Sequence, residues 1–67
     1  MHKFDLGQKV QYRPPPGMYA PRGAYLVTAK LPERDGEFEY RIRSASEEYE
    51  RLARESELRA LGDANAP

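Results

Sequence analysis

The sequence predicts a small, mainly β domain, and three local patterns support this prediction. Apolar and charged residues alternate strictly over Phe38–Arg43, the period of two of a strand with one buried and one exposed face. Residues 24–31 are rich in β-branched and aromatic side chains, which favour strands. Residues 32–36 have the composition of a turn and end in Asp35-Gly36. A connection of this length predicts an antiparallel hairpin, because a parallel crossover needs a longer one.

Another strand is expected before this hairpin. Gly7 permits the positive φ of a tight turn, and Val10 and Tyr12 then share one face of the chain. Pro14-Pro15-Pro16 ends this strand, because proline has no N–H for the ladder. Residues 14–23 therefore form a long loop, in which the proline run is either a stiff segment or a polyproline II ligand for an aromatic groove.

The alternation assigns side chains to a core and to a surface. Tyr40 and Ile42 are expected inside, with Arg41 and Arg43 outside. The strand at 24–31 has an expected inner face of Tyr25, Val27, Ala29 and Leu31 and an outer face of Leu26, Thr28 and Lys30. Among the aromatic residues, Tyr25, Phe38 and Tyr40 are predicted core positions, and Tyr12, Tyr19 and Tyr49 are the surface candidates.

The segment after Arg43 is open to two interpretations. Residues 46–59 have high helix propensity, and Ser46 is a suitable N-cap ahead of an acidic first turn. Local signals therefore favour a helix at about 47–61, packed on a three-stranded antiparallel sheet. We expect one domain over 1–61, followed by a disordered tail at 62–67, which is small and polar.

Six short blocks in order along the chain resemble a family of small, uncharacterised proteobacterial proteins. These blocks span residues 4–58 and are Phe4-x-x-Gly7-Gln8-x-Val10, Gly23-x-Tyr25-x-Val27, Leu31-Pro32, Tyr40-Arg41-Ile42-Arg43, Glu50-Arg51 and Glu55-Ser56-Glu57-Leu58. The family looks like an SH3-like small β-barrel, the general shape of Tudor and KOW domains. The long proline-containing loop departs from this pattern, and the resemblance implies no activity.

The resemblance changes the expectation for the C-terminal part. It implies a fourth strand over Tyr49–Arg54 and a 3₁₀ turn over Glu55–Leu58, followed by a short fifth strand. Leu52 would then point inward and Leu58 would close the end of the barrel. We therefore predict an SH3-like, partly open barrel of four to five short antiparallel strands, because tertiary context can override helix propensity. The sheet with a helix at 47–61 is the alternative.

Length and composition exclude several classes of protein. A chain of 67 residues forms one domain at most, and without cysteine it has neither disulfides nor thiolate metal sites. No apolar run approaches the roughly 20 residues of a membrane span, and no apolar signal region follows Lys3. We therefore expect a cytoplasmic protein with no membrane partner.

No set of residues has a catalytic or metal-binding pattern. The single histidine, His2, is expected to be a solvated end residue. The serines have no histidine nearby in the sequence to act as a base. The glutamates of 47–57 lack the Gly-containing loop pattern of a Ca²⁺ or Mg²⁺ site and are expected to form a solvated face. We expect no enzyme activity, no metal and no cofactor.

The charges are unevenly distributed along the chain. Residues 1–30 hold five basic residues and one acid, and residues 44–67 hold three basic residues and six acids, although the whole chain is neutral. Either the basic half carries a binding face, or the two halves pair with each other. Likewise, Arg41 either meets a ligand or pairs with Glu50 across the sheet. The candidate binding residues are Arg13, Tyr19, Arg22, Lys30, Arg41 and Arg43.

These observations predict a non-catalytic, monomeric binding module. Its site would comprise the 14–23 loop, whose Met18 and Tyr19 suit adaptable contacts, and the outward face of the two central strands. A protein or peptide is the predicted partner, because dedicated nucleic-acid domains are usually basic and this chain is neutral. Weak binding of RNA or single-stranded DNA is the alternative.

Overall fold

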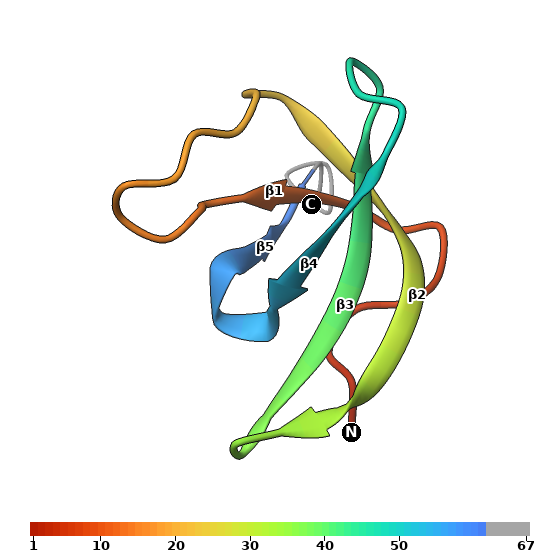
Figure 1. Ribbon diagram of the computed structural model, residues 1–67. Coiled ribbons are helices and arrows are strands. Elements are labelled where there is room, and N and C mark those ends of the chain that lie inside the picture. Colours follow the sequence, from red (N-terminus) through yellow and green to blue (C-terminus); the bar gives the residue numbers. More distant parts are fainter. Residues whose placement is uncertain (62–67) are drawn as a thin grey trace.

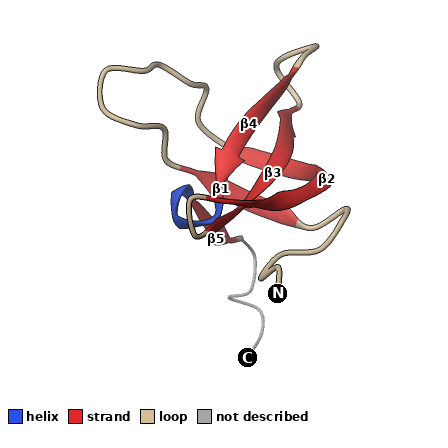
Figure 2. Ribbon diagram, turned by 60° about the horizontal axis from the view of Figure 1, so that its bottom comes forward, coloured by secondary structure: helices blue, strands red, loops and turns tan. Residues whose placement is uncertain are grey.

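Five antiparallel strands form one curled sheet in the computed structural model, which describes residues 1–61 (Figures 1 and 2). The strands are β1 Lys9–Tyr12, β2 Ala24–Arg34, β3 Glu37–Ser44, β4 Glu50–Arg54 and β5 Leu58–Ala60, and the 3₁₀ turn η1 covers Glu55–Glu57. Their order across the sheet is β4-β3-β2-β1-β5. The predicted fold, a partly open small barrel with a 3₁₀ turn, is confirmed. The alternative helix at 47–61 is wrong, and the tail at 62–67 lies outside the described residues.

The connection between β2 and β3 is shorter than the five-residue turn expected at 32–36. Strand β2 continues to Arg34, and Asp35-Gly36 alone makes the turn. Both residues have positive φ, 54° and 82°, as a two-residue type I′ hairpin turn requires. Pro32 is tolerated within β2 because the ladder to β1 ends at Leu26 and the register to β3 is irregular between Leu31 and Arg34.

A bulge in β2 changes the expected faces of this strand. Val27 pairs with Ile42, but Lys30 pairs with Tyr40, so the register shifts at Thr28. An extra residue on one strand moves every following side chain to the other face. The expected inner set of Tyr25, Val27, Ala29 and Leu31 is therefore wrong after Val27. Tyr25 and Val27 are buried, but Ala29 and Leu31 are only half-buried.

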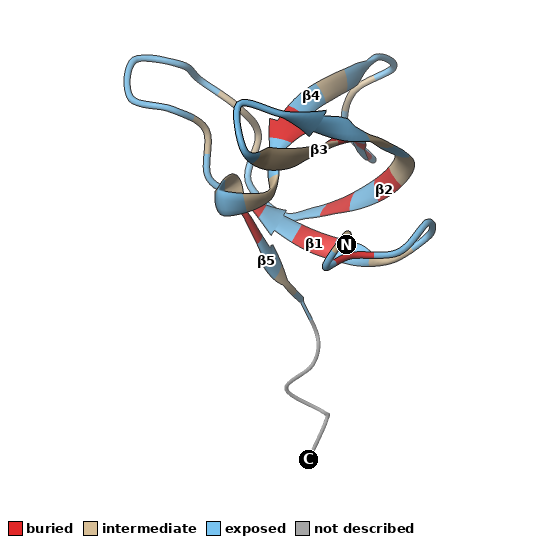
Figure 3. Cartoon of the chain, turned by 90° about the horizontal axis from the view of Figure 1, so that it is seen from below, coloured by how far each residue is buried: buried red, intermediate tan, exposed pale blue. Residues whose placement is uncertain are grey.

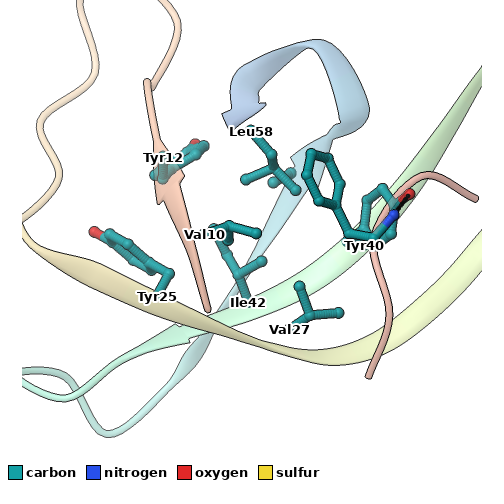
Figure 4. Packing of buried hydrophobic residues seen from close by; sticks show 9 residues of the cluster. Val10, Tyr12, Tyr25, Val27, Tyr40, Ile42 and Leu58 are labelled. Carbon is teal, nitrogen blue, oxygen red and sulfur yellow. Dashed lines mark hydrogen bonds between the residues drawn. The ribbon is translucent and has the colours of Figure 1, made fainter. Parts of the chain in front are cut away.

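The core fills the barrel with side chains from all five strands and the N-terminal segment (Figures 3 and 4). Tyr40 and Ile42 are fully buried and Arg41 and Arg43 are exposed, as predicted. Tyr12 and Tyr25 lie at one end of the cluster and Tyr40 at the other (Figure 4). The buried members are Phe4, Val10, Tyr12, Tyr25, Val27, Tyr40, Ile42, Ala53 and Leu58, with Ala20, Phe38 and Ala60 packed against them.

Strand β4 has the opposite register to the one expected. Leu52 pairs with the outward-facing Arg41 and is 53% exposed, whereas Ala53 pairs with Tyr40 and is fully buried. The small alanine leaves space in the barrel for the tyrosine ring across from it. The expectation that Leu52 points inward is therefore wrong, but Leu58 is buried as predicted.

The N-terminal segment packs against the barrel rather than lying free in solvent. The His2 Nε2 atom donates to the Leu31 carbonyl oxygen at 2.6 Å, and its ring lies 4.3 Å from the Phe38 ring, centroid to centroid. Phe4 is buried beside Tyr40, with an edge-to-face ring contact. The expectation that His2 is a solvated end residue is therefore wrong.

Candidate functional site

The loop between β1 and β2, residues 13–23, is fastened to the barrel at several points. The Arg13 amide donates to the Glu57 carbonyl oxygen at 2.9 Å, so η1 holds the start of the loop. The Tyr25 hydroxyl donates to the Pro21 carbonyl oxygen at 2.8 Å and holds its end. Between them, the Tyr12 hydroxyl lies 3.9 Å from the Met18 sulfur. Core side chains, Tyr12 and Tyr25, make two of these three contacts, and the backbone of η1 makes the third.

The proline run has a local structural role in this loop. The Met18 amide donates to the Pro15 carbonyl oxygen at 3.1 Å, which closes a four-residue turn. Pro16 and Gly17 are its central residues, and Gly17 has a φ of 88°. A proline followed by a residue of positive φ is the signature of a type II turn. The prolines therefore fix the direction in which the loop returns towards the barrel.

An open groove lies between this loop and the barrel, and we call it the loop groove. Its walls are the loop on one side and the end of β1, η1 and β5 on the other. Figure 1 shows where these strands lie relative to the loop. It is lined by Gln11, Tyr12, Arg13, Pro14, Met18, Tyr19, Ala20, Pro21, Arg22, Gly23, Ser56, Glu57, Leu58 and Arg59.

Exposed side chains of Met18, Tyr19 and three arginines are among those that line the groove. Tyr19 is 84% exposed and Met18 is 50% exposed. Three arginines line the groove, Arg13, Arg22 and Arg59, and all are exposed. Glu57 is the one acid among the described lining residues, and its carboxylate accepts a 2.9 Å hydrogen bond from the Arg54 amide. The loop groove is therefore positively charged and partly apolar.

The structure brings together only some of the predicted binding residues. Arg13, Tyr19 and Arg22 meet in the loop groove. Arg41 and Arg43 lie apart from them, on the outward face of β3. The expected outward face of Lys30 is wrong, because the bulge at Thr28 places Lys30 opposite Tyr40, away from the face of this arginine pair. The Lys30 ammonium instead lies 3.6 Å from the Asp5 carboxylate.

The ion pairs answer the two electrostatic alternatives. Glu50 pairs in register with Arg43 and not with Arg41, so the expected Arg41–Glu50 pair is wrong. Within residues 1–61 the ion pairs are Lys30–Asp5, Arg51–Glu47 and Arg54–Glu37. None of them joins the basic residues of 1–30 to the acids of 44–61. Arg13, Arg22 and Arg59 have no ion-pair partner in this part of the chain.

Arg59 belongs to the groove but was not among the predicted residues. It reaches the groove because β5 pairs with β1, where Arg59 stands opposite Gln11. This pairing joins segments that lie far apart in the sequence, and local periodicity carries no information on it. The only sequence signal is the position of Arg59 directly after Leu58, the residue expected to close the barrel.

Arg51 and Glu47 form a second polar feature, near the loop groove. The Arg51 guanidinium donates to both Glu47 carboxylate oxygens, at 2.9 and 2.7 Å. Only 17% of the Arg51 side chain and 9% of the Glu47 side chain are exposed. These hydrogen bonds lower the pKa of Glu47, and the guanidinium also lies 5.7 Å from the centre of the Tyr49 ring. Glu47 is thus an exception to the solvated acidic face expected at 47–57.

The tyrosines beside the groove are held in their neutral form. Burial raises the pKa of Tyr12, and the nearby Glu57 carboxylate raises it further. Burial likewise raises the pKa of Tyr25. Their hydroxyls therefore stay protonated and donate hydrogen bonds, Tyr12 to the Met18 sulfur and Tyr25 to the Pro21 carbonyl oxygen. These two side chains act as fixed supports of the loop rather than as acids or bases.

The described residues contain neither a candidate metal site nor a membrane-spanning helix. Within 1–61, no three His, Cys, Asp or Glu side chains gather closely enough to hold a metal ion. No helix in this range is long and apolar enough to cross a membrane. A scan of protein-family models, curated proteins and solved structures finds no match to this chain.

Proposed function

We propose that this protein is a non-catalytic binding module that holds a peptide segment of a protein partner in the loop groove. One observation carries the proposal. The loop is fastened at its start, middle and end by Glu57, Tyr12 and Tyr25, yet Met18 and Tyr19 remain exposed. A surface that is ordered before binding loses less conformational entropy on association.

The composition of the groove supports a protein partner. Tyrosine, methionine and arginine are enriched in protein interfaces relative to the rest of the surface, and all three line the loop groove. Tyr19 offers a large amphipathic ring with few rotatable bonds. Met18 offers a flexible apolar side chain that adapts to the shape of its partner.

The outward face of the sheet favours a second function, weak binding of single-stranded nucleic acid. Lys9 and Arg43 both pair with Leu26, so these cations flank it on neighbouring strands. Strands lie about 4.8 Å apart and rise about 3.4 Å per residue, which places Arg41 about 7 Å from Arg43 along β3. Cations spaced in this way can follow a phosphate backbone. Glu50 lies opposite Arg43, and its negative charge disfavours phosphate binding at this position.

A peptide selection followed by NMR tests the proposed function. Peptides selected from a random library against the whole protein should shift the amide signals of residues 13–23 and 56–59. Tyr19→Ala should weaken their binding at least tenfold. Tyr49→Ala is the matched control, since Tyr49 is also exposed but does not line the groove. Selected peptides that shift only the outward residues of β2 and β3 would contradict the proposal.

A further inference from the structure

The three arginines of the loop groove come from two segments of the chain, the loop and β5. Arg13 begins the loop, Arg22 precedes its end and Arg59 lies on β5. All are exposed and lack an ion-pair partner within the described residues. The one acid described in the lining, Glu57, already accepts the Arg54 amide. With three arginines and one acid, the described lining has a net positive charge, although the whole chain is neutral.

Two of these arginines have a spacing set by the sheet. Arg59 stands opposite Gln11, so the two residues share one face. Arg13 follows Gln11 by two residues and so lies on the same face. The Arg13 amide donates to the Glu57 carbonyl oxygen, which extends the β1–β5 pairing by one residue. Arg13 and Arg59 are therefore diagonal neighbours, for which the separation is about 7–8 Å.

An extended peptide presents its side chains at a matching spacing. Alternate residues of a strand lie about 7 Å apart on the same side. Two carboxylates on alternate residues would therefore reach Arg13 and Arg59 together, and arginine binds a carboxylate through two parallel hydrogen bonds.

We infer that the ligand of the loop groove is an extended acidic peptide with carboxylate side chains at alternate positions. Arg13 and Arg59 bind two successive carboxylates, and Arg22 adds a third cation from the loop wall. Tyr19 and Met18 cover the peptide side chains that lie between the two carboxylates. This inference rests on the proposed function, because it names the ligand of the same groove.

Synthetic octapeptides with blocked ends test the charge requirement. Four Glu-Thr repeats should shift the amide signals of Arg13, residues 18–23 and Arg59, and should bind at least tenfold more tightly than four Gln-Thr repeats. Four Lys-Thr repeats should not bind. The affinity for the Glu-Thr peptide should fall as salt rises, because exposed charges carry the contact.

Matched variants separate a site from general attraction between charges. The double variant Arg13→Gln with Arg59→Gln should bind the Glu-Thr peptide at least tenfold more weakly. The control double variant, Arg41→Gln with Arg43→Gln, removes the same charge from the outward face of β3 and should leave the affinity for this peptide unchanged. Equal losses in the two double variants would overturn the inference. Both double variants should unfold at the wild-type urea concentration, which excludes a loss of fold as the cause.

The outcomes also distinguish this inference from the proposed function. Library-selected peptides that bind the groove but contain no acidic residues would overturn the inference that the ligand is acidic. Equal binding of the Glu-Thr and Gln-Thr peptides to the groove would overturn it too. In both cases the proposed function, peptide binding, would stand. If neither selected nor synthetic peptides shift the groove, both proposals fall. If an octamer of thymidine shifts the same amides more strongly than the Glu-Thr peptide, nucleic acid replaces the peptide as ligand.

Discussion

The Tyr40 hydroxyl donates a hydrogen bond to the Glu55 carboxylate and so joins the middle of β3 to η1. The same hydroxyl oxygen accepts the amides of Lys3 at 2.9 Å and Phe4 at 3.2 Å. Burial raises the pKa of Tyr40, and its bond to the Glu55 carboxylate raises it further. One buried side chain thus holds the N-terminal segment and the 3₁₀ turn on the same end of the barrel.

Removing this hydroxyl should destabilise the protein. Tyr40→Phe leaves the buried Phe4 amide without its acceptor, which costs about 1–3 kcal/mol of unfolding free energy. Tyr49→Phe is the matched control, because the Tyr49 hydroxyl bonds only to Glu47 at the surface, and it should change stability by about 0.5 kcal/mol or less. Urea denaturation measures both. Equal effects would show that the Tyr40 network does not hold the barrel end.

The register of β3 predicts different losses of unfolding free energy for substitutions at two neighbouring residues, Ile42 and Arg41. Ile42→Ala removes a fully buried side chain and should cost about 2–5 kcal/mol. Arg41→Ala alters an exposed side chain and should cost about 0.5 kcal/mol or less. A loss for Arg41→Ala as large as that for Ile42→Ala would mean that the assigned faces are wrong.

The register of β4 predicts that a change at the small Ala53 costs more unfolding free energy than a change at the larger Leu52. Leu52→Ala should change the unfolding free energy by about 0.5 kcal/mol or less, because Leu52 faces solvent. Ala53→Leu should cost about 1–3 kcal/mol, because the added atoms meet the Tyr40 side of the core. Urea denaturation of the two variants checks the assignment, and a larger loss for Leu52→Ala would contradict it.

Acid should destabilise the fold through its hydrogen-bonded glutamates. Hydrogen bonds from Arg51, Ser56 and Tyr40 lower the pKa values of Glu47, Glu37 and Glu55, respectively. The unfolded chain then binds more protons than the folded one in acid, so the stability contributed by these groups is complete above about 4.3, the ordinary pKa of glutamate. It is lost as the pH falls through the lower folded values.

A pair of adjacent glutamates tests this linkage. Glu47→Gln should reduce the difference in unfolding free energy between pH 7 and pH 3, because the amide that replaces the carboxyl group has no proton to bind in this range. Glu48→Gln should leave the difference unchanged, since Glu48 is exposed and the Arg51 guanidinium donates to Glu47 instead. Urea denaturation at the two pH values gives both differences. An equal reduction in the two variants would show that the Arg51–Glu47 bonds are not the source.

The sequence predicted the parts of the fold that local pattern controls. The alternation over 38–43 gave the faces of Tyr40 and Ile42, and the proline run gave the end of β1. The bulge at Thr28 has no local signature, so the face of Lys30 was predicted wrongly. Leu52 faces outward because Ala53 packs against Tyr40 across the sheet, which is a contact between strands that a local pattern does not contain.

The candidate site was predicted only in part for a similar reason. Arg13, Tyr19 and Arg22 belong to a loop that composition alone marks as unusual, so sequence reasoning found them. Arg59 joins them through the β1–β5 pairing, and the fastening of the loop depends on contacts from Tyr12, Tyr25 and Glu57. These are long-range consequences of closing the barrel, which no local pattern contains.

The loop groove exists before any ligand binds, because the core side chains Tyr12 and Tyr25 hold the loop. NMR of the free protein measures this directly. We predict nuclear Overhauser contacts from the Tyr25 ring to Pro21 and from the Tyr12 ring to the Met18 methyl group. The ¹⁵N relaxation of residues 18–23 should match that of β1 and β2. Absence of both contacts, together with fast motion of the amides within residues 18–23, would show that the free loop is not held.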